Sequence, residues 1–426
     1  MSARRTRVVS PVGAVAGLFL LSFLAVLSAS LSVLGIKLGN APVMPWEQLI
    51  PLGIYAVGVP AVLVWMRVNG WKGDAGLAGA VFLLCGLGVT VQFRMGSFSR
   101  GLADPMALAP LPLGLLAFAA GVALTAKRRG AWLARTGWAA YLAALGVLAA
   151  LLLLGRKYRG GLYLAGNINP TELVKPLLVL FLASFLSRRQ KAFSETQVGI
   201  PVPSLDALLV LIFLWAGPVL LTLAVKDLGL LLLLNAILVV MLFAVARSTG
   251  YLALGLAAVT AAGYGVRFLS PHVRARFDVW LNPFEDPTGK GWQILQALAA
   301  MYSGGWWGAG LGSGVPQTVP IVTSDFVYAA LAEEIGLAGC ALLLAVYAVL
   351  FSRGFRCAGA ARTPFERLLG VGMTGALAMQ TILNVAGVTK ALPMTGITLP
   401  LISHGGSSLI TTLLMAGLVT GLSDRR

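Results

Sequence analysis

The residues of this chain that are best suited to chemistry are carboxylates embedded in apolar sequence. Asp325 follows a long loop rich in glycine and tryptophan, and Glu333 and Glu334 come next in an otherwise apolar stretch. A carboxylate at membrane depth costs about 2.5–3.5 kcal/mol on insertion scales, so three along one helix indicate a function. We therefore predict that Asp325 is the catalytic residue. The alternative is that Asp325 only caps the start of a helix, where negative charge is favoured.

Two acid–base pairs precede this stretch. Glu172 and Lys175 lie three residues apart, so they share one face of a helix and can pair within its first turn. Such a pair can be purely structural, but a cation held by its own carboxylate can also bind a phosphate group. Lys226 and Asp227 form the second pair, between two strongly apolar segments. A tight turn at Gly229 is the alternative explanation there.

The segment 270–324 is the longest polar interruption of the chain. It begins with two cations, Arg274 and Arg276, and continues through Gln293 to a glycine-rich run at 303–314. We expect its middle part, with its tryptophans, to form an amphipathic helix at headgroup depth. The glycines permit close backbone approach. Loops of this length are commonly lids or binding loops, so we assign the segment to ligand binding.

The last polar cluster runs from 390 to 408 and contains Lys390, His404, Ser407 and Ser408. Two prolines and a Gly-Gly pair interrupt the helical pattern. Irregular backbone cannot face lipid, so this segment must be buried in protein or line a cavity. His404 is either a buried histidine with satisfied hydrogen bonds or a residue of the functional site.

Membrane-spanning helices must position these residues. The chain of 426 residues is 58% hydrophobic and 11% charged, which excludes a soluble globular protein. Apolar segments long enough to cross about 30 Å of hydrocarbon recur throughout. We count twelve: 12–36, 49–66, 76–93, 110–126, 137–155, 172–187, 205–225, 228–246, 250–269, 325–351, 366–389 and 400–421. The predicted fold is an all-α polytopic membrane protein with about 12 transmembrane helices and one large extracytoplasmic loop at 270–324.

Basic residues orient the helices. With the N-terminus inside, 19 of the 32 lysines and arginines fall on the cytoplasmic side, as the positive-inside rule requires. The even number of helices places both termini in the cytoplasm and all four polar clusters outside. The net charge of +17 is attributed mainly to an inner rim facing anionic membrane lipids, and no nucleic acid is expected as a partner. A surplus of cations on the outer face suggests an anionic ligand there.

In their order along the chain, the four clusters resemble the motifs of the SEDS family (shape, elongation, division and sporulation proteins). Residues 324–336 resemble the family block T-D-F-I-F-A…E-E-L-G, and 398–408 are similar to L-P-F-I-S-Y-G-G-S-S. Residues 169–175 match Q-P-S-E-x-x-K, and 227–229 match D-L-G. The resemblance covers roughly residues 165–420.

This resemblance implies a ten-helix core. The family normally has three helices before the Glu172 motif, whereas we count five, so the chain carries an extra N-terminal pair. We divide the chain into N-terminal transmembrane helices at 1–155, which include that pair, and a SEDS-like catalytic core at 156–426. His404 stands where tyrosine is usual, and Asn169 where glutamine is usual. Neither change removes the acid or the basic residues, so we expect an active protein.

The resemblance also implies a peptidoglycan glycosyltransferase. Such enzymes polymerise lipid-linked disaccharide–pentapeptide (lipid II) into glycan strands at the outer face of the bacterial cytoplasmic membrane. They usually bind a class B penicillin-binding protein, a transpeptidase, and work with the division, elongation or sporulation machinery. The family's essential loop aspartate falls on Asp325.

Transfer from a pyrophosphate-linked sugar needs cations for the leaving group and a base for the attacking hydroxyl. We assign Asp325 as the base and Glu172 as the residue that orients Lys175. The candidates for binding the pyrophosphate are Lys175, Arg274, Arg276 and Lys390. The other candidate substrate-binding residues are Lys226, Asp227, Gln293, His404, Ser407 and Ser408. We expect the helix N-terminus and nearby cations to lower the pKa of Asp325. No cofactor is implied with certainty, but a divalent cation, Mg or Mn, could bridge the carboxylate and the pyrophosphate.

Two other functions fit parts of the pattern. A flippase or transporter of the lipid-linked precursor suits twelve helices, and intramembrane charges could mark its path. The lack of a visible internal repeat and the position of every polar cluster on one face speak against it. A non-catalytic scaffold for a penicillin-binding protein is the second alternative.

Overall fold

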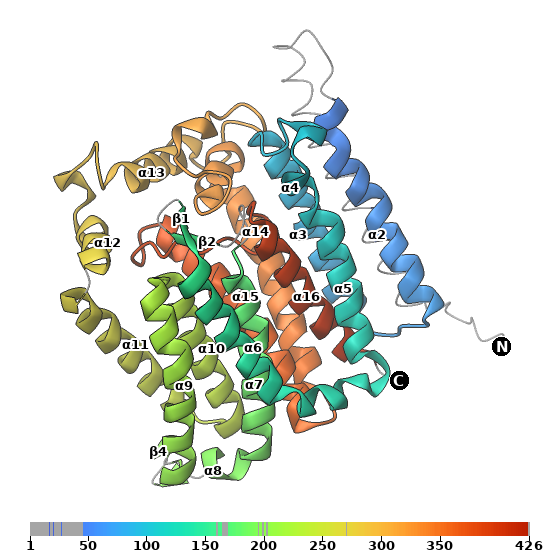
Figure 1. Ribbon diagram of the computed structural model, residues 1–426. Coiled ribbons are helices and arrows are strands. Elements are labelled where there is room, and N and C mark those ends of the chain that lie inside the picture. Colours follow the sequence, from blue (N-terminus) through green and yellow to red (C-terminus); the bar gives the residue numbers. More distant parts are fainter. Residues whose placement is uncertain are drawn as a thin grey trace, which may run out of the picture.

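The computed structural model describes residues 46–158, 161–163, 169–194, 196–197, 200–201, 203–269 and 271–424, with three isolated positions before residue 46. The first predicted span, 12–36, therefore lies outside the described residues. At each of the other predicted spans the chain forms a helix, and the helices stand side by side in one bundle (Figure 1).

Long helices occupy these spans. They are α2 (Ile50–Val68), α3 (Ala75–Arg94), α5 (Pro110–Thr125), α6 (Gly137–Leu154), α7 (Thr171–Arg188), α9 (Leu205–Val225), α10 (Leu228–Ala246), α11 (Gly250–Leu269), α14 (Val327–Gly359), α15 (Pro364–Val388) and α16 (Gly406–Leu422). The shorter helices are α4 (Pro105–Leu108), α8 (Gln190–Ser194), α12 (Pro271–Leu281) and α13 (Trp292–Gly304). The 3-10 helices are η1 (Trp46–Leu49), η2 (Gly101–Ala103), η3 (Ala126–Arg135), η4 (Pro283–Glu285) and η5 (Pro316–Thr318).

Short strands, which the sequence did not predict, join some of these helices. Strand β1 (Arg156–Tyr158) pairs antiparallel with β2 (Gly161–Tyr163) between α6 and α7. Strand β3 (Thr196–Gln197) pairs in the same way with β4 (Ile200–Pro201) between α8 and α9. The predicted all-α class therefore holds for the bundle, and the strands are confined to its connections.

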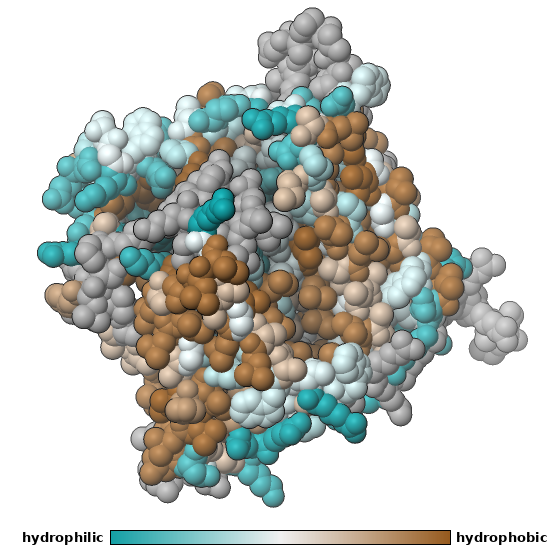
Figure 2. Space-filling view, in the orientation of Figure 1, coloured by the Kyte–Doolittle hydropathy of each residue, from teal (hydrophilic) through white to brown (hydrophobic). Residues whose placement is uncertain are grey.

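Eight of the described helical segments are long and apolar enough to cross a membrane. Helix α7 carries three charged residues within its 18 residues, and α16 has only 17 residues. Figure 2 shows apolar side chains over the middle of the bundle and hydrophilic ones toward both ends. The bundle is thus of the membrane-spanning type, whereas a total of about twelve spans stays a prediction.

Glycines bring helices α5 and α16 into close backbone contact. A Cβ added to Gly417 would lie 2.2 Å from the carbonyl oxygen of Phe118, and one added to Gly121 would lie 2.7 Å from that of Leu414. Small residues at helix contacts are the usual means of packing helices in a membrane, where apolar surface alone gives no preference between protein and lipid.

Helix α3 belongs to the centre of the bundle, whereas α2 lies at its edge (Figure 1). In the most apolar stretch of each span, 83% of α3 is buried but only 33% of the α2 segment. Gly88 of α3 leaves no room for a side chain, because a Cβ there would lie 2.1 Å from the carbonyl oxygen of Leu401. Helix α3 therefore packs directly on the segment that leads into α16.

The segment 270–324 is not an open loop, since α12, η4, α13 and η5 divide it. Helix α13 confirms that its middle part is helical. The glycine-rich run then docks on α14 at Gly336, which interrupts that helix with φ of +65° and ψ of −174°. There the N–H groups of residues 337–338 donate to the carbonyls of 305–306 at 2.9 and 3.1 Å, and the carbonyls of 333–334 accept from 309–310 at 2.9 and 3.0 Å.

Candidate active site

Asp325 lies just before α14, and its backbone is held by helix α15. Asn384 donates from Nδ2 to the carbonyl oxygens of Asp325, at 2.9 Å, and Ile397, at 2.7 Å. Helix α14 begins at Val327, and Phe326 occupies the N-cap position without a side-chain cap. Asp325 therefore precedes the N-cap position of α14 rather than occupying it. Its carboxylate is left for another role.

Arg276 of α12 faces the Asp325 carboxylate across Gly396. A Cβ added to Gly396 would lie 3.6 Å from Oδ2 of Asp325 and 3.9 Å from both terminal nitrogens of Arg276. Gly396 has φ of +76°, which side chains rarely adopt, so glycine suits this position on both counts. Arg276 Nη1 also donates to the carbonyl of Met394 at 2.9 Å. The guanidinium is thereby fixed beside the acid.

Burial dominates the electrostatics of this cluster. It raises the pKa of Asp325, an effect that a hydrogen bond from Ser324 and the charge of Arg276 oppose and the charge of Asp227 increases. Burial likewise raises the pKa of Asp227, against a hydrogen bond from the Leu230 N–H. We predicted a lowered pKa for Asp325, and this was wrong because loss of solvent outweighs the nearby cation. A carboxylate with a raised pKa is a stronger base at neutral pH.

Glu172 and Lys175 make the predicted ion pair in the first turn of α7. Asn169 lies two residues before α7, and its Oδ1 accepts from the backbone N–H and the hydroxyl of Thr171 at 3.1 and 2.7 Å. The Lys175 side chain is only 2% exposed, and its Nζ also donates to Oε1 of Gln380 in α15 at 2.8 Å. The buried ammonium group thus has partners on two helices, as a buried charge requires.

Gln380 also forms hydrogen bonds with the segment before α16. Its Nε2 donates to the carbonyl and the hydroxyl of Thr398 at 3.1 and 3.2 Å. The Thr398 hydroxyl shares a hydrogen bond of 2.8 Å with Ser408. One chain of polar contacts therefore joins α7, α15 and α16 behind Asp325.

Glu333 and Glu334 hold the glycine-rich run rather than the Asp325 cluster. Glu334 pairs with Arg94 of α3 at 2.7 Å, and Arg94 also donates to the carbonyl of Gly314 at 2.7 Å. Glu333 Oε1 accepts from the backbone N–H of Val315 at 2.9 Å. Of the three carboxylates that drew attention in the sequence, two thus have structural partners and only Asp325 faces the cluster with Arg276.

Most of the remaining predicted residues have no described contact with the Asp325 carboxylate, whereas the charge of Asp227 acts on both Asp325 and Arg276. The exposed side chains are those of Lys226, Arg274 and Gln293. Lys390 and Ser407 are half-buried, and their backbone carbonyls accept from Trp280 Nε1 and Thr411 Oγ1, each at 3.0 Å. Asp227 caps α10 by accepting from a backbone N–H at 2.9 Å, which agrees with the turn that was its alternative explanation.

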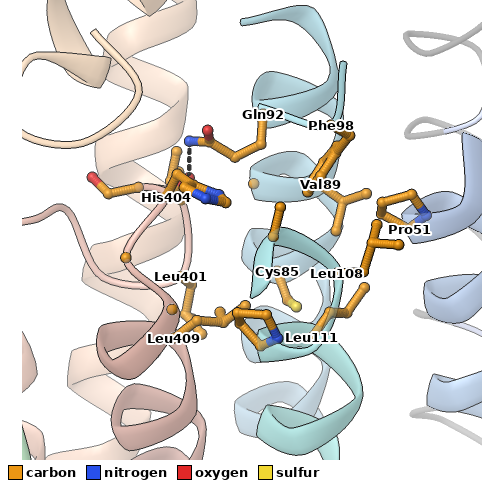
Figure 3. A pocket seen from close by; sticks show the side chains of 17 residues that line it. Pro51, Cys85, Val89, Gln92, Phe98, Leu108, Leu111, Leu401, His404 and Leu409 are labelled. Atoms are coloured by element: carbon orange, nitrogen blue, oxygen red, sulfur yellow. Dashed lines mark hydrogen bonds between the residues drawn. The ribbon is translucent and has the colours of Figure 1, made fainter. Parts of the chain in front are cut away.

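His404 lies in a small cavity between α2, α3, α5 and the segment before α16 (Figure 3). Its backbone N–H donates to the carbonyl of Thr323 at 2.7 Å, and its ring meets that of Phe98 edge-on, with centroids 6.1 Å apart. Gln92 donates to the same Thr323 carbonyl at 3.0 Å. Burial lowers the pKa of His404 against the attraction of Asp104. The largely apolar surroundings favour a packing role for this residue.

Sequence reasoning missed several polar residues that apolar helices contribute. Gln380 and Asn384 lie four residues apart, on one face of the predicted span 366–389, and that spacing could have indicated them. Gln92 gave no such signal, because the carbonyl that it contacts lies 231 residues further along the chain. Its partner depends on how α3 is threaded into the bundle.

The fold and the site define a multi-pass helical membrane protein with a half-buried acid and a guanidinium group at one end of its bundle. The profile of the cell cycle protein family FTSW_RODA_SPOVE matches residues 111–426. The chain belongs to this family, which confirms the resemblance seen in its motifs.

Relatives and solved structures agree with this membership. The peptidoglycan glycosyltransferase RodA of Mycobacterium tuberculosis (strain ATCC 25618 / H37Rv) is 33% identical over 426 residues, covering 96% of this chain and 90% of the relative. Stage V sporulation protein E of Bacillus subtilis (strain 168) is 36% identical over 263 residues, covering 61% and 69%. A chain of a peptidoglycan synthase complex superposes with a TM-score of 0.65 at 29% identity, covering 83% and 98%. Thermus thermophilus rod shape determining protein RodA gives a TM-score of 0.59 at 28% identity, covering 84% and 99%.

We predict that Glu172 and Lys175 act as one unit in stability. Removing either partner leaves an uncompensated buried charge, at a cost of about 3–5 kcal/mol. Glu172→Ala and Lys175→Ala should each lower the thermal unfolding temperature in detergent, and the double variant should be no worse than the poorer single variant. Arg353→Ala is the control, because its pair with Asp74 is 41% and 28% exposed and should contribute about 1 kcal/mol or less. Additive losses from Glu172→Ala and Lys175→Ala would mean two independent roles.

A second prediction concerns pH. Since the folded protein raises the pKa of Asp325, it binds that proton more tightly than the unfolded chain, and stability falls as pH rises through this window. Asp325→Asn cannot ionise and should unfold at a higher temperature than the wild type at about pH 7.5, with the difference shrinking toward about pH 4. Glu285→Gln, at an exposed position, should show no such trend. A less stable Asp325→Asn at about pH 7.5 would show that the attraction between the carboxylate and Arg276 outweighs burial.

Proposed function

We propose that this protein is a peptidoglycan glycosyltransferase that polymerises lipid-linked disaccharide–pentapeptide (lipid II) into glycan strands. The family and the activity named for its mycobacterial relative support this assignment. The observation that carries it is the Asp325 carboxylate, which has a raised pKa and faces the guanidinium of Arg276. A base beside a fixed cation is what glycosyl transfer from a pyrophosphate requires.

In the proposed reaction, Asp325 accepts the proton of the acceptor sugar's 4-hydroxyl as that oxygen attacks the anomeric carbon of the donor. The bond between this carbon and the pyrophosphate oxygen breaks, and the pyrophosphate leaves with the electron pair. A single displacement inverts the anomeric carbon and needs no enzyme nucleophile. The positive charge of Arg276 stabilises the leaving group.

Lys175 and Glu172 are assigned to positioning. The ammonium group is almost fully buried and already contacts Glu172 and Gln380, so these contacts favour holding helices together over binding pyrophosphate directly. Through Gln380 and Thr398 it supports the segment that carries Gly396, across which the acid and Arg276 meet. Arg274 and Lys390 remain the candidates for contacting the pyrophosphate from the surface.

A divalent cation fits this site only with help from the substrate. In the part of the chain that the structure describes, no three His, Cys, Asp or Glu side chains gather to hold a metal ion. Mg²⁺ commonly takes one or two carboxylates together with substrate phosphates and waters, and Asp325 and Asp227 could supply the carboxylates. Bound there, the cation would neutralise charge on the leaving pyrophosphate.

The end of the bundle that carries Asp325 is proposed to face the outside of the bacterial cytoplasmic membrane, with both termini in the cytoplasm. The concentration of basic residues at the opposite end supports this orientation. A class B penicillin-binding protein is the proposed partner within the division, elongation or sporulation machinery. The structural likeness to a chain of a peptidoglycan synthase complex supports such an assembly.

Asp325→Ala is predicted to abolish glycan synthesis while leaving expression and membrane insertion close to those of the wild type. Asp325→Asn should be nearly as inactive, because an amide cannot accept the proton. The measurement is the formation of glycan chains from purified lipid II by the protein, with its partner synthase if required. Glu285→Gln, which changes an exposed carboxylate before α13, serves as the matched control.

The rival functions give different results in this assay. Wild-type synthesis by Asp325→Asn would refute the role as a base. A wild-type protein that moves lipid II across a vesicle membrane without making glycan would be a flippase. One that only increases the activity of its partner would be a scaffold.

We also propose that residues 1–68 contain the N-terminal helix pair added to a ten-helix core. The peripheral α2 supports this choice, whereas α3 contacts the segment before α16 through Gly88 and Gln92. Deleting 1–68 removes an even number of predicted spans and keeps the orientation of the rest. The shortened protein should still polymerise lipid II. Correct insertion without polymerisation would show that the pair contributes to the reaction.

A further inference from the structure

The end of the bundle opposite to Asp325 carries a surface that the proposed reaction does not use. Here η3 runs across the ends of the helices between α5 and α6 (Figure 1). Among the residues of η3 whose burial the structure describes, Ala126, Gly130 and Leu133 are buried. Its exposed residues include Lys127, Trp132 and Arg135. The segment is therefore amphipathic, with its apolar side on the bundle and cations and an indole facing outward.

Two hydrogen bonds fix η3 to the end of α7. The carbonyl of Ala134 accepts from Ser184 Oγ at 2.7 Å and from Arg188 Nη2 at 3.1 Å. Arg135, the next residue, is thereby placed beside the C-terminal end of α7, where Arg188 and Arg189 are both exposed. Arginines from two separate elements thus meet on one surface.

Aromatic residues frame these arginines. Trp132 is 49% exposed and Trp138, at the start of α6, is 53% exposed. The Arg189 guanidinium lies over the ring of Phe185, 4.5 Å from its centroid. We call Trp132, Arg135, Trp138, Arg188 and Arg189 the inner basic patch. Figure 2 shows a hydrophilic rim along this end, directly below the apolar middle of the bundle.

The described acidic residues nearby do not cancel the charge of the patch. Asp206, at the start of α9, interacts with Arg189, and Glu366 is buried against Gly130. Asp424 lines a separate cavity with Lys127, so Lys127 is left out of the patch. In the described part of the chain, three exposed guanidinium groups therefore face one exposed carboxylate.

We propose that the inner basic patch binds the headgroup of an anionic phospholipid in the leaflet on this side of the membrane. Guanidinium groups bind phosphate oxygens in a fixed bidentate geometry. Exposed tryptophans at the edge of an apolar belt lie at headgroup depth, and the belt itself accommodates the acyl chains. An acidic protein segment would satisfy the charge, but it would not account for indoles at this boundary.

The test compares lipid binding by two variants with equal loss of charge. Arg135→Gln/Arg189→Gln alters the patch, and Arg100→Gln/Lys290→Gln alters two exposed cations at the Asp325 end. Native mass spectrometry of the full-length protein in detergent measures bound phosphatidylglycerol and, separately, phosphatidylcholine. The patch variant should bind phosphatidylglycerol about tenfold more weakly than the wild type. The control variant should bind it as the wild type does, and phosphatidylcholine binding should not change.

Three results would overturn the proposal. In the first, the patch variant binds phosphatidylglycerol as well as the wild type does. In the second, the control variant loses as much phosphatidylglycerol binding as the patch variant. In the third, the wild-type protein binds phosphatidylcholine as strongly as phosphatidylglycerol. If the double variant does not insert, Arg135→Gln alone decides the question, since this exposed residue can be replaced without disturbing the Ala134 contacts. An acidic peptide that displaces both phosphatidylcholine and phosphatidylglycerol from the patch would overturn the proposal in favour of a protein partner.

Discussion

A buried ammonium group, that of Lys175, is the constraint on which the architecture of the site depends. A charge removed from solvent must be paired and fully hydrogen-bonded, or the fold loses several kcal/mol. Glu172 meets half of this requirement from the same helix turn, and Gln380 meets the rest from α15. Gln380 can donate to Thr398 only if the segment before α16 lies beside it. The need to satisfy one cation thus sets the relative positions of three helices.

The fold could be predicted to the extent that it follows from hydrophobicity. Apolar runs located the described helices that can cross a membrane, including the short α5, because a span needs length and few charges. Hydrophobicity could not predict which helix lies at the centre of the bundle. Helix α3 and helix α2 are similarly apolar, and what separates them is the Gly88 contact with Leu401, which depends on tertiary packing.

The site was predictable in its residue types but not in its electrostatics. Burial cost alone indicated Asp325, and three-residue spacing indicated the Glu172–Lys175 pair, because both arguments are local. The pKa of Asp325 was misjudged because it depends on how closely α15 and the segment around Gly396 enclose the carboxylate. The cost of burial applied to Glu333 and Glu334 as well, although only Asp325 was assigned to catalysis from the sequence. Their partners, Arg94 and the glycine-rich run, are brought to them only by the fold.

The interruption of α14 at Gly336 has a consequence for the local stability of the surface near Asp325. The backbone groups on either side of the break take their hydrogen bonds from the glycine-rich run, and leaving such groups unpaired in apolar surroundings costs several kcal/mol each. Neither segment can therefore detach while the other keeps its structure. Residues 304–314 and the first turns of α14 form one cooperative unit of local unfolding, although they are separate in sequence. Any fluctuation that releases the loop therefore also releases the start of the helix that follows Asp325. The position of the Asp325 carboxylate is then only as well ordered as the loop.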